Sequence, residues 1–346
     1  MSRPDDELGR REFLRRATRS AVFAAASTRV ASGAVPKSKT ISLADTIPIR
    51  TLGKTGVRLP LLGYGGAALP RVWGNPLSIE DRVKVVRHAY DRGVRYYDTA
   101  GNYMESQPIL AEALKDVRDD VFLTSKVEVT QASRTREAFE RVLDEMKTDY
   151  LDAILIHGTP GLEQMTVEEA LKVHRELVRL RDEGAVRFIG FSAHSYFDKA
   201  LALIESDGFD LCMLSYGYIP RGYDQIWTAR MTELRNACLA KAHERDMGIV
   251  AMKVVGGGVL GAWSGDIVPG FDRKRLTQLP AAAIRYVLDD DRVHLLAIGM
   301  RLEDEIDANI KTLSDDVTYT EHDRGLLAEF CAKAYDSDTI KRMKVD

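Results

Sequence analysis

The sequence predicts a closed (β/α)₈ barrel, and three observations lead to this fold class. Short, nearly continuous apolar runs alternate with amphipathic segments, which is the pattern of parallel strands covered by helices. Eight such runs can be counted after a first hairpin. No GxGxxG motif follows the first run, so a closed barrel is favoured over a doubly wound sheet.

The elements follow one another from about residue 47. Residues 47–52 and 57–60 flank a Gly-rich turn, and we expect them to form a β-hairpin. The barrel strands are predicted around the apolar runs 61–64, 94–97, 121–124, 153–156, 188–191, 211–214, 249–252 and 295–298. The helical pattern, with Ser78 as the first N-cap, covers 78–90, 133–146, 167–183, 233–245, 280–288 and 303–313.

Residues 1–39 differ from the rest of the chain in charge. They hold nine Lys and Arg residues against four acids, although the whole chain has a net charge of −3. Arg10-Arg11 precede a short apolar stretch at 21–26 and small residues at 31–34, which resembles a twin-arginine (Tat) export signal. We therefore expect a signal peptide or disordered leader, a partnership with the Tat translocation machinery, and a periplasmic or exported protein. A basic tail on a cytoplasmic protein is the alternative.

Composition excludes several functional classes. The chain has 49 Lys and Arg residues against 52 Asp and Glu residues, which argues against a nucleic-acid partner. Cys212, Cys238 and Cys331 form no CxxC pair, so we expect no iron–sulfur cluster, no zinc site and no disulfide framework. No apolar run approaches the roughly 20 residues of a membrane span, and no cysteine follows the apolar leader stretch. We therefore expect no stable membrane anchor.

Polar side chains stand at the ends of consecutive predicted strands. Asp98 and Tyr103 follow the second run, Lys126 follows the third, and His157 follows the fourth. The carboxyl ends of barrel strands meet at one rim, where (β/α)₈ enzymes carry their chemistry. Each residue alone is weak evidence, because a strand-end lysine is usually solvated and a lone histidine is usually structural. Four on consecutive strands indicate a site.

These four residue types suit the reduction of a carbonyl by hydride from a nicotinamide. Negative charge grows on the carbonyl oxygen, which must be protonated as it forms. A tyrosine with a pKa near about 10 gives up its proton more easily beside an ammonium. Tyr103, Lys126 and Asp98 supply the donor, the ammonium and the carboxylate that holds it. His157 can donate a hydrogen bond that orients the carbonyl, and no metal is required.

From about residue 47 to 335 the chain resembles the aldo-keto reductase family of NAD(P)(H)-dependent (β/α)₈ barrels. The resemblance is carried by Asp98-Thr99-Ala100-x-x-Tyr103, Ser125-Lys126, His157, Ile189-Gly190-Phe191-Ser192, and Ile298-Gly299-Met300-Arg301 with Asn309. It implies a catalytic tetrad of Asp98, Tyr103, Lys126 and His157. It also implies that the hairpin closes the barrel bottom, with residues 336–346 left as a C-terminal tail.

The resemblance further implies a cofactor site. Gly63 would line it, Ser192 would bind the carboxamide, Arg301 the 2′-phosphate and Asn309 the adenine. We place Lys253 and the turn Gly256-Gly257-Gly258 in the same site, because glycines let backbone N–H groups approach a pyrophosphate. A merely flexible loop is the alternative. Arg301 favours NADP, whereas Glu305 opposes the phosphate, so NAD is possible too.

Some positions depart from the family pattern. Ala193 and Met213 replace carboxamide partners, and Met252-Lys253 replace an aromatic residue. Three functions therefore stay open: a carbonyl reductase or alcohol dehydrogenase acting on a small-molecule carbonyl substrate, a nicotinamide-binding regulatory or partner protein, and a barrel with a decayed cofactor site. Loop residues on the same rim offer aromatic walls and two cations for a substrate, namely Trp73, Tyr218, Trp227, Arg71 and Arg221.

Overall fold

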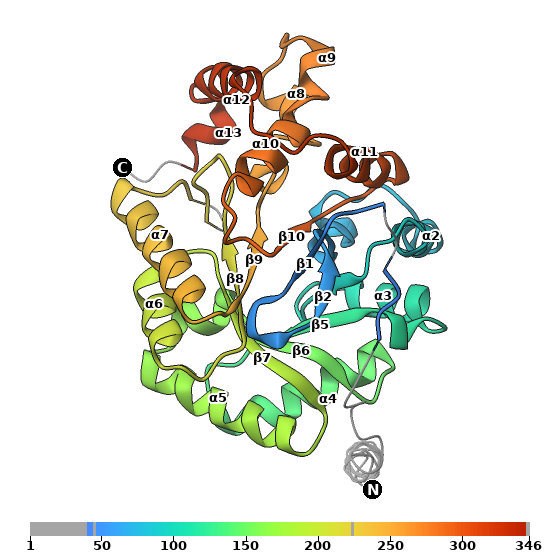
Figure 1. Ribbon diagram of the computed structural model, residues 1–346, viewed down its shortest axis with the longest axis vertical. Coiled ribbons are helices and arrows are strands. Elements are labelled where there is room, and N and C mark those ends of the chain that lie inside the picture. Colours follow the sequence, from blue (N-terminus) through green and yellow to red (C-terminus); the bar gives the residue numbers. More distant parts are fainter. Residues whose placement is uncertain (1–39, 44–45, 223–224, 344–346) are drawn as a thin grey trace, which may run out of the picture. The chain divides into compact units, whose positions relative to one another are not determined.

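The computed structural model describes residues 40–43, 46–222 and 225–343, and it contains the predicted closed barrel (Figure 1). Eight parallel strands close in the order β10-β3-β4-β5-β6-β7-β8-β9. Their bounds are Leu62–Gly65 (β3), Tyr96–Asp98 (β4), Phe122–Val127 (β5), Leu151–Ile156 (β6), Val186–Ala193 (β7), Leu211–Ser215 (β8), Gly248–Met252 (β9) and Leu295–Ile298 (β10). Each strand overlaps one of the eight apolar runs, so the fold prediction is confirmed.

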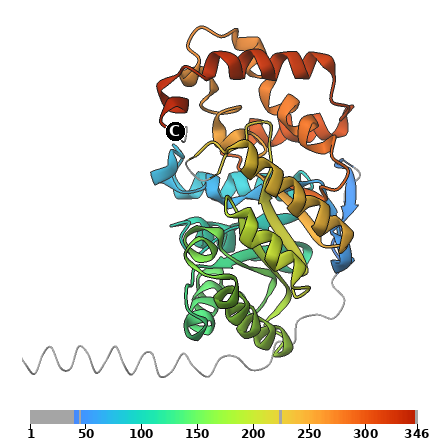
Figure 2. The same ribbon diagram turned by 90° about the vertical axis from the view of Figure 1, so that its left-hand side faces the viewer.

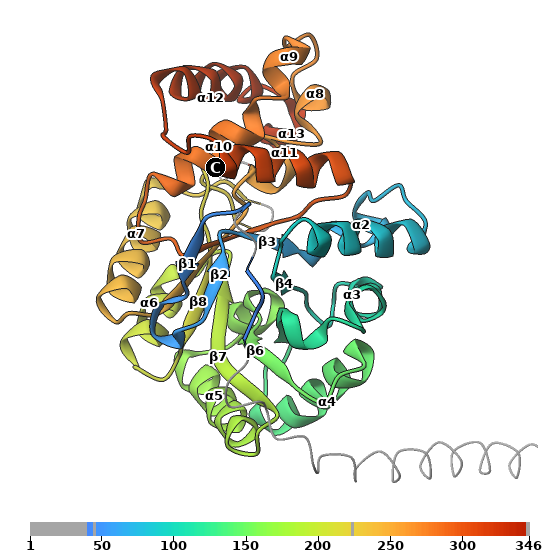
Figure 3. The same cartoon turned by 45° about the vertical axis from the view of Figure 1, so that its right-hand side comes forward.

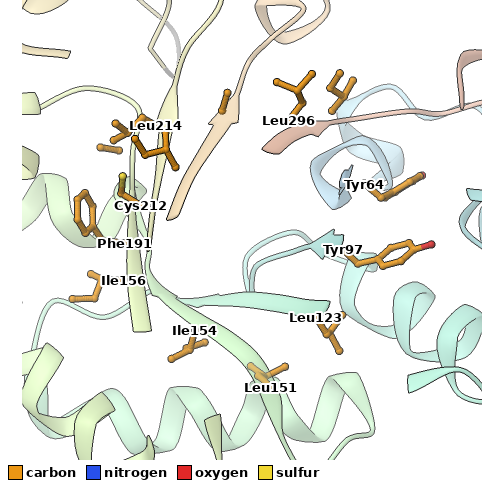
Figure 4. Close-up of a cluster of buried hydrophobic side chains, with 14 of the residues drawn as sticks. Tyr64, Tyr97, Leu123, Leu151, Ile154, Ile156, Phe191, Cys212, Leu214 and Leu296 are labelled. Atoms are coloured by element: carbon orange, nitrogen blue, oxygen red, sulfur yellow. The ribbon is translucent and has the colours of Figure 1, made fainter. Parts of the chain in front are cut away.

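Side chains alternate between the inside and the outside of the barrel, as strand geometry requires. Tyr96 points into the interior and stacks on Phe122, with ring centroids 5.5 Å apart, whereas its neighbour Tyr97 belongs to the outer core between strands and helices. Figure 4 shows part of this outer core, including Tyr64 and Tyr97. Both layers are almost entirely buried, which explains why the strands read as apolar runs.

Helices cover the outside of the barrel (Figures 1 and 3). The longer ones are Ile79–Asp91 (α2), Ser106–Leu114 (α3), Thr135–Met146 (α4), Val167–Asp182 (α5), Phe197–Glu205 (α6), Ala229–Glu244 (α7), Leu279–Leu288 (α10), Glu303–Ser314 (α11) and Glu321–Ala334 (α12). The predicted N-cap is confirmed, because the Ser78 side chain accepts a hydrogen bond from the Asp81 N–H. The sequence pattern had not identified α3, α6 and α12.

The predicted hairpin consists of β1 (Ile49–Thr51) and β2 (Arg58–Pro60), which pair antiparallel. Leu52 and Leu59 enter the interior cluster of the barrel from its N-terminal end. Gly53 has φ +45°, and a Cβ there would lie 2.5 Å from the Asp246 carbonyl oxygen. The chain therefore approaches the start of β9 more closely than any other residue would allow, and the hairpin closes the barrel bottom as expected.

The chain after β10 contributes to a second, smaller core beside the barrel (Figure 2). In this core α12 packs on α10 and on the segments that follow β8 and β9, and Phe330 and Ile340 are buried. A short helix, Asp338–Lys341 (α13), contributes Ile340, and the Met343 carbonyl accepts a hydrogen bond from the Ile226 N–H. Residues 338–343, which the sequence placed in a C-terminal tail, are thus packed against the loop after β8.

Within the described ranges, no helix combines the length and the apolar character that crossing a bilayer would demand.

Candidate active site

The barrel rim brings the four expected catalytic residues together. Asp98 ends β4, Lys126 lies near the end of β5, His157 directly follows β6, and Tyr103 lies in the loop between β4 and α3. All four are at least nine-tenths buried. The four side chains therefore lie together at the carboxyl ends of consecutive strands, as the sequence predicted.

Lys126 and Asp98 form a buried ion pair. The Lys126 ammonium donates to both Asp98 carboxylate oxygens, at 2.7 and 2.8 Å, and to the Thr99 carbonyl at 2.7 Å. Burial disfavours the charged amine, but Asp98 and Tyr103 outweigh this effect, so the pKa of Lys126 lies above its ordinary value. The rim thus holds a fixed positive charge.

Tyr103 stands directly over this charge. The Lys126 Nζ lies 4.8 Å from the centroid of the Tyr103 ring, and the rings of Trp73 and His157 meet it edge-on at 5.3 and 5.7 Å. Burial raises the pKa of Tyr103, while Lys126 opposes that rise by stabilising the phenolate. The expected effect of the lysine is present, but in this structure burial outweighs it.

Glu128 is a member of the site that the sequence reasoning missed. Its Oε1 lies 3.1 Å from Nδ1 of His157, and its other oxygen would lie 2.6 Å from a Cβ at Gly101. Burial lowers the pKa of His157, and Lys126 lowers it further, whereas Glu128 raises it. The one available sequence signal was an acid standing two residues after Lys126, beyond the end of an apolar strand.

The triple-glycine turn has an unusual backbone conformation. Lys253 and all three glycines have positive φ angles, between 59° and 99°, which explains the run of glycines. The N–H groups of Gly256 and Gly258 donate within the loop, to the carbonyls of Lys253 (2.8 Å) and Val255 (3.1 Å). In this conformation the N–H groups of Gly256 and Gly258 are already used within the loop, so they are not free to bind an anion.

Side-chain cations converge on the same turn instead. A Cβ on Gly257 would lie 3.0 Å from Arg221 Nη1 and 3.7 Å from Lys253 Nζ. Arg221 also donates to the Gly256 carbonyl at 3.0 Å, so it ties the loop after β8 to the loop after β9. Two positive charges beside a glycine turn are complementary to a pyrophosphate, and the residues present fit such a group.

The remaining expected cofactor residues, Ser192, Asn309 and Gly63, lie at different distances from the rim of the barrel. Ser192 is buried near the end of β7 and accepts a hydrogen bond from the Gly158 N–H at 2.9 Å. Asn309 is buried on α11. Gly63 lies two residues below the rim inside the barrel, where a Cβ would meet the Tyr96 ring at 2.6 Å. The absence of a side chain at Gly63 therefore makes room for Tyr96.

Arg301 follows β10 and connects two loops at the rim. Its Nη2 donates to the Trp73 carbonyl at 3.0 Å, and its guanidinium lies 5.3 Å from the centroid of the Trp263 ring. The Glu305 carboxylate accepts from the Arg301 N–H at 2.6 Å. The cation and the opposing acid that the sequence identified are thus neighbours, and Glu303 and Asp304 add two more carboxylates to the first turn of α11.

The structure also shows where the residues that depart from the family pattern lie. Met213 is buried in the interior barrel core, and Ala193 ends β7. His194, the next residue, is buried. Its burial and, to a lesser extent, the positive charge of nearby Lys253 hold the pKa of His194 well below the ordinary range. Across the described residues, no three His, Cys, Asp or Glu side chains are grouped so that they could hold a metal ion.

Comparison with known proteins gives a consistent result. The sequence model described as the Aldo/keto reductase family matches residues 61–325. Over 158 residues the chain is 30% identical to L-galactose dehydrogenase of Arabidopsis thaliana, covering 42% of this chain and 48% of that protein. Over 138 residues it is 33% identical to the methylglyoxal reductase DkgA of Yersinia pestis, covering 39% and 45%. The matched segments thus span less than half of these relatives.

Solved structures extend the comparison to nearly the whole barrel. The holo form of an aldo-keto reductase from Bacillus halodurans superimposes with a TM-score of 0.63 at 19% identity, covering 82% of this chain and 96% of that chain. An aldo-keto reductase from Pseudomonas gives a TM-score of 0.60 at 22% identity, covering 79% and 96%. At these identities the likeness concerns the fold.

Proposed function

Because the chain belongs to the aldo/keto reductase family, we propose that it is an NAD(P)H-dependent oxidoreductase that reduces an aldehyde or ketone, or oxidises the corresponding alcohol. One observation carries this proposal: the Lys126–Asp98 ion pair lies beneath the ring of Tyr103. Such an arrangement suits proton donation to an oxygen that gains negative charge.

Each residue of the site has a distinct task in this proposal. A reduced nicotinamide, when bound, supplies the hydride. The Tyr103 hydroxyl gives its proton to the carbonyl oxygen, and the Lys126 ammonium stabilises the phenolate that remains. Asp98 accepts two hydrogen bonds from Lys126 and so keeps the ammonium charged and in place. Trp73 packs edge-on against Tyr103 and helps to hold its ring in place.

We propose that the dinucleotide is held by residues at or after the carboxyl ends of β7 to β10 and on α11. These residues are Ser192, Lys253, Gly256, Gly257, Gly258, Arg301 and Asn309, with Arg221 added on the basis of its position at Gly257. Arg301 supports a modest preference for NADP(H), since its guanidinium has donors beyond the one that binds the Trp73 carbonyl. The three carboxylates of the first turn of α11 keep this preference small.

Arg301→Ala tests the cofactor proposal. We expect the variant to bind NADPH about tenfold more weakly and NADH nearly unchanged, because it loses a charge-assisted bond to the 2′-phosphate. Fluorescence titration with each reduced cofactor measures both affinities without turnover. Arg324→Ala is a matched control, because Arg324 also stacks on an aromatic ring but lies on α12. Equal losses for the two cofactors would show that Arg301 does not bind the phosphate.

We also propose that residues 1–39, which lie outside the described residues, direct export through the Tat machinery. The proposal is supported by Arg10-Arg11 and the basic charge of this segment. Arg10→Lys with Arg11→Lys should keep the protein in the cytoplasm at full length, whereas the wild type should reach the periplasm shortened by about 25–40 residues. Cell fractionation with an immunoblot decides. A full-length wild type confined to the cytoplasm would contradict export.

A further inference from the structure

Glu128 lies partly buried beside His157, although it does not belong to the expected tetrad. It follows the end of β5, two residues after Lys126, and its side chain is only 20% exposed. One carboxylate oxygen lies 3.1 Å from His157 Nδ1, and the His157 side chain is 3% exposed. The other oxygen lies over Gly101, in the loop that carries Tyr103, where any larger residue would displace it.

This contact determines how His157 carries its proton. A carboxylate can only accept a hydrogen bond, so a nitrogen that is bonded to it must carry hydrogen. Neutral imidazole has a single N–H. If Nδ1–H points at Glu128, then Nε2 of neutral His157 has a lone pair and no proton. The nitrogen paired with a neighbour thus sets the tautomer of the ring.

We propose that Glu128 is a positioning residue that accepts the Nδ1–H of His157 and leaves Nε2 of the neutral ring as a hydrogen-bond acceptor. Neutral His157 then accepts a hydrogen bond from the Tyr103 hydroxyl or from a substrate alcohol. It cannot donate to a carbonyl, which differs from the role that the sequence analysis assigned to it. Donation from Nε2 requires the imidazolium, so Tyr103 is the donor of this pair when His157 is neutral.

The surroundings of His157 make the neutral form the prevalent one at pH 7. Ionisable groups from several elements face His157. Lys126 lies within β5 and Glu128 directly follows that strand, Tyr103 precedes α3, and His194 follows β7. Burial lowers the pKa of His157 below its ordinary value of about 6.5, and Glu128 opposes this. Imidazolium therefore forms only as the pH falls, and removing the Glu128 charge lowers this pKa further.

The tautomer can be read directly by long-range ¹H–¹⁵N correlation spectra of the ¹⁵N-labelled full chain, with His157 assigned from the His157→Asn variant. We expect a protonated Nδ1 and an unprotonated Nε2 in the wild type at pH 8. His174 serves as an internal control, because its Nε2 lies 2.8 Å from the Gly208 carbonyl and must carry the proton there. A wild-type His157 with its proton on Nε2 overturns the proposal.

Glu128→Gln tests the effect of the charge at constant size. We expect the pKa of His157 to fall by about one unit, as for the loss of a neighbouring opposite charge, with His174 unchanged. An unchanged pKa of His157 contradicts the proposal, whereas the tautomer should persist, because the glutamine carbonyl oxygen can accept the same Nδ1–H. The kinetic consequence rests on the proposed function: any limb of the pH profile for carbonyl reduction that follows the ionisation of His157 should move to lower pH by the same amount. If no carbonyl is reduced, the proposed function fails, whereas the tautomer measurement still decides the role of Glu128.

Discussion

Tyr103→Phe should lower the rate of carbonyl reduction by about 10²-fold or more, the usual scale of general acid catalysis. The variant loses the hydroxyl that donates the proton, but it keeps the ring that packs against Trp73 and His157. Folding should therefore be preserved, and the affinity for reduced cofactor should stay nearly unchanged. Steady-state rates at saturating cofactor, together with a fluorescence titration, measure the two quantities separately.

Tyr196→Phe is the matched control for this prediction. Tyr196 also has a lysine ammonium over its ring, with Lys199 Nζ 4.9 Å from the centroid, but its side chain is 44% exposed. The control should retain the wild-type rate. A Tyr103→Phe variant that keeps more than half of the wild-type rate would exclude Tyr103 as the proton donor.

Lys126→Met should have the largest combined effect on stability and activity. It leaves the buried Asp98 carboxylate without its partner, and breaking a buried pair in this way costs about 3–5 kcal/mol of the free energy of unfolding. It also removes the charge that stabilises the Tyr103 phenolate, so the pKa of Tyr103 should rise further. The acidic limb of the pH profile for alcohol oxidation, which needs the phenolate, should therefore move to higher pH.

The double variant Asp98→Asn with Lys126→Met separates these two effects. Because it leaves no unpaired buried charge, it should recover much of the stability lost in Lys126→Met, as measured by denaturant unfolding. Its pH profile should still be displaced, since the ammonium is absent in both variants. An acidic limb that stays in place in the residual activity of Lys126→Met would show that Lys126 is not coupled to Tyr103.

The parts of the fold that could be predicted from sequence share a local signal. Every barrel strand is buried on both faces, so each is visible as an apolar run. The helix α3 escaped detection because most of its side chains are buried, which leaves no polar face for a helical period to show. In α12 the buried side chains contact a second core that no local pattern describes.

The same distinction holds for the site. Asp98, Lys126 and His157 could be placed because each stands at or near a strand end, and barrel closure then brings them together. Glu128 could not be assigned, because its partner His157 is 29 residues away and only the three-dimensional contact gives it a role. The glycine turn was recognised, yet the convergence of Arg221 on Gly257 depends on packing between two loops.

The central claim is that this chain transfers hydride between a nicotinamide and a carbonyl compound. Incubating the protein with reduced cofactor deuterated at C4 and a panel of aldehydes and ketones tests it, with mass spectrometry of the alcohols formed. We predict deuterium at the former carbonyl carbon of at least one product, formed at least about 10²-fold more slowly by Tyr103→Phe. Saturable cofactor binding with no deuterium in any product would contradict the claim and support a regulatory nicotinamide-binding barrel.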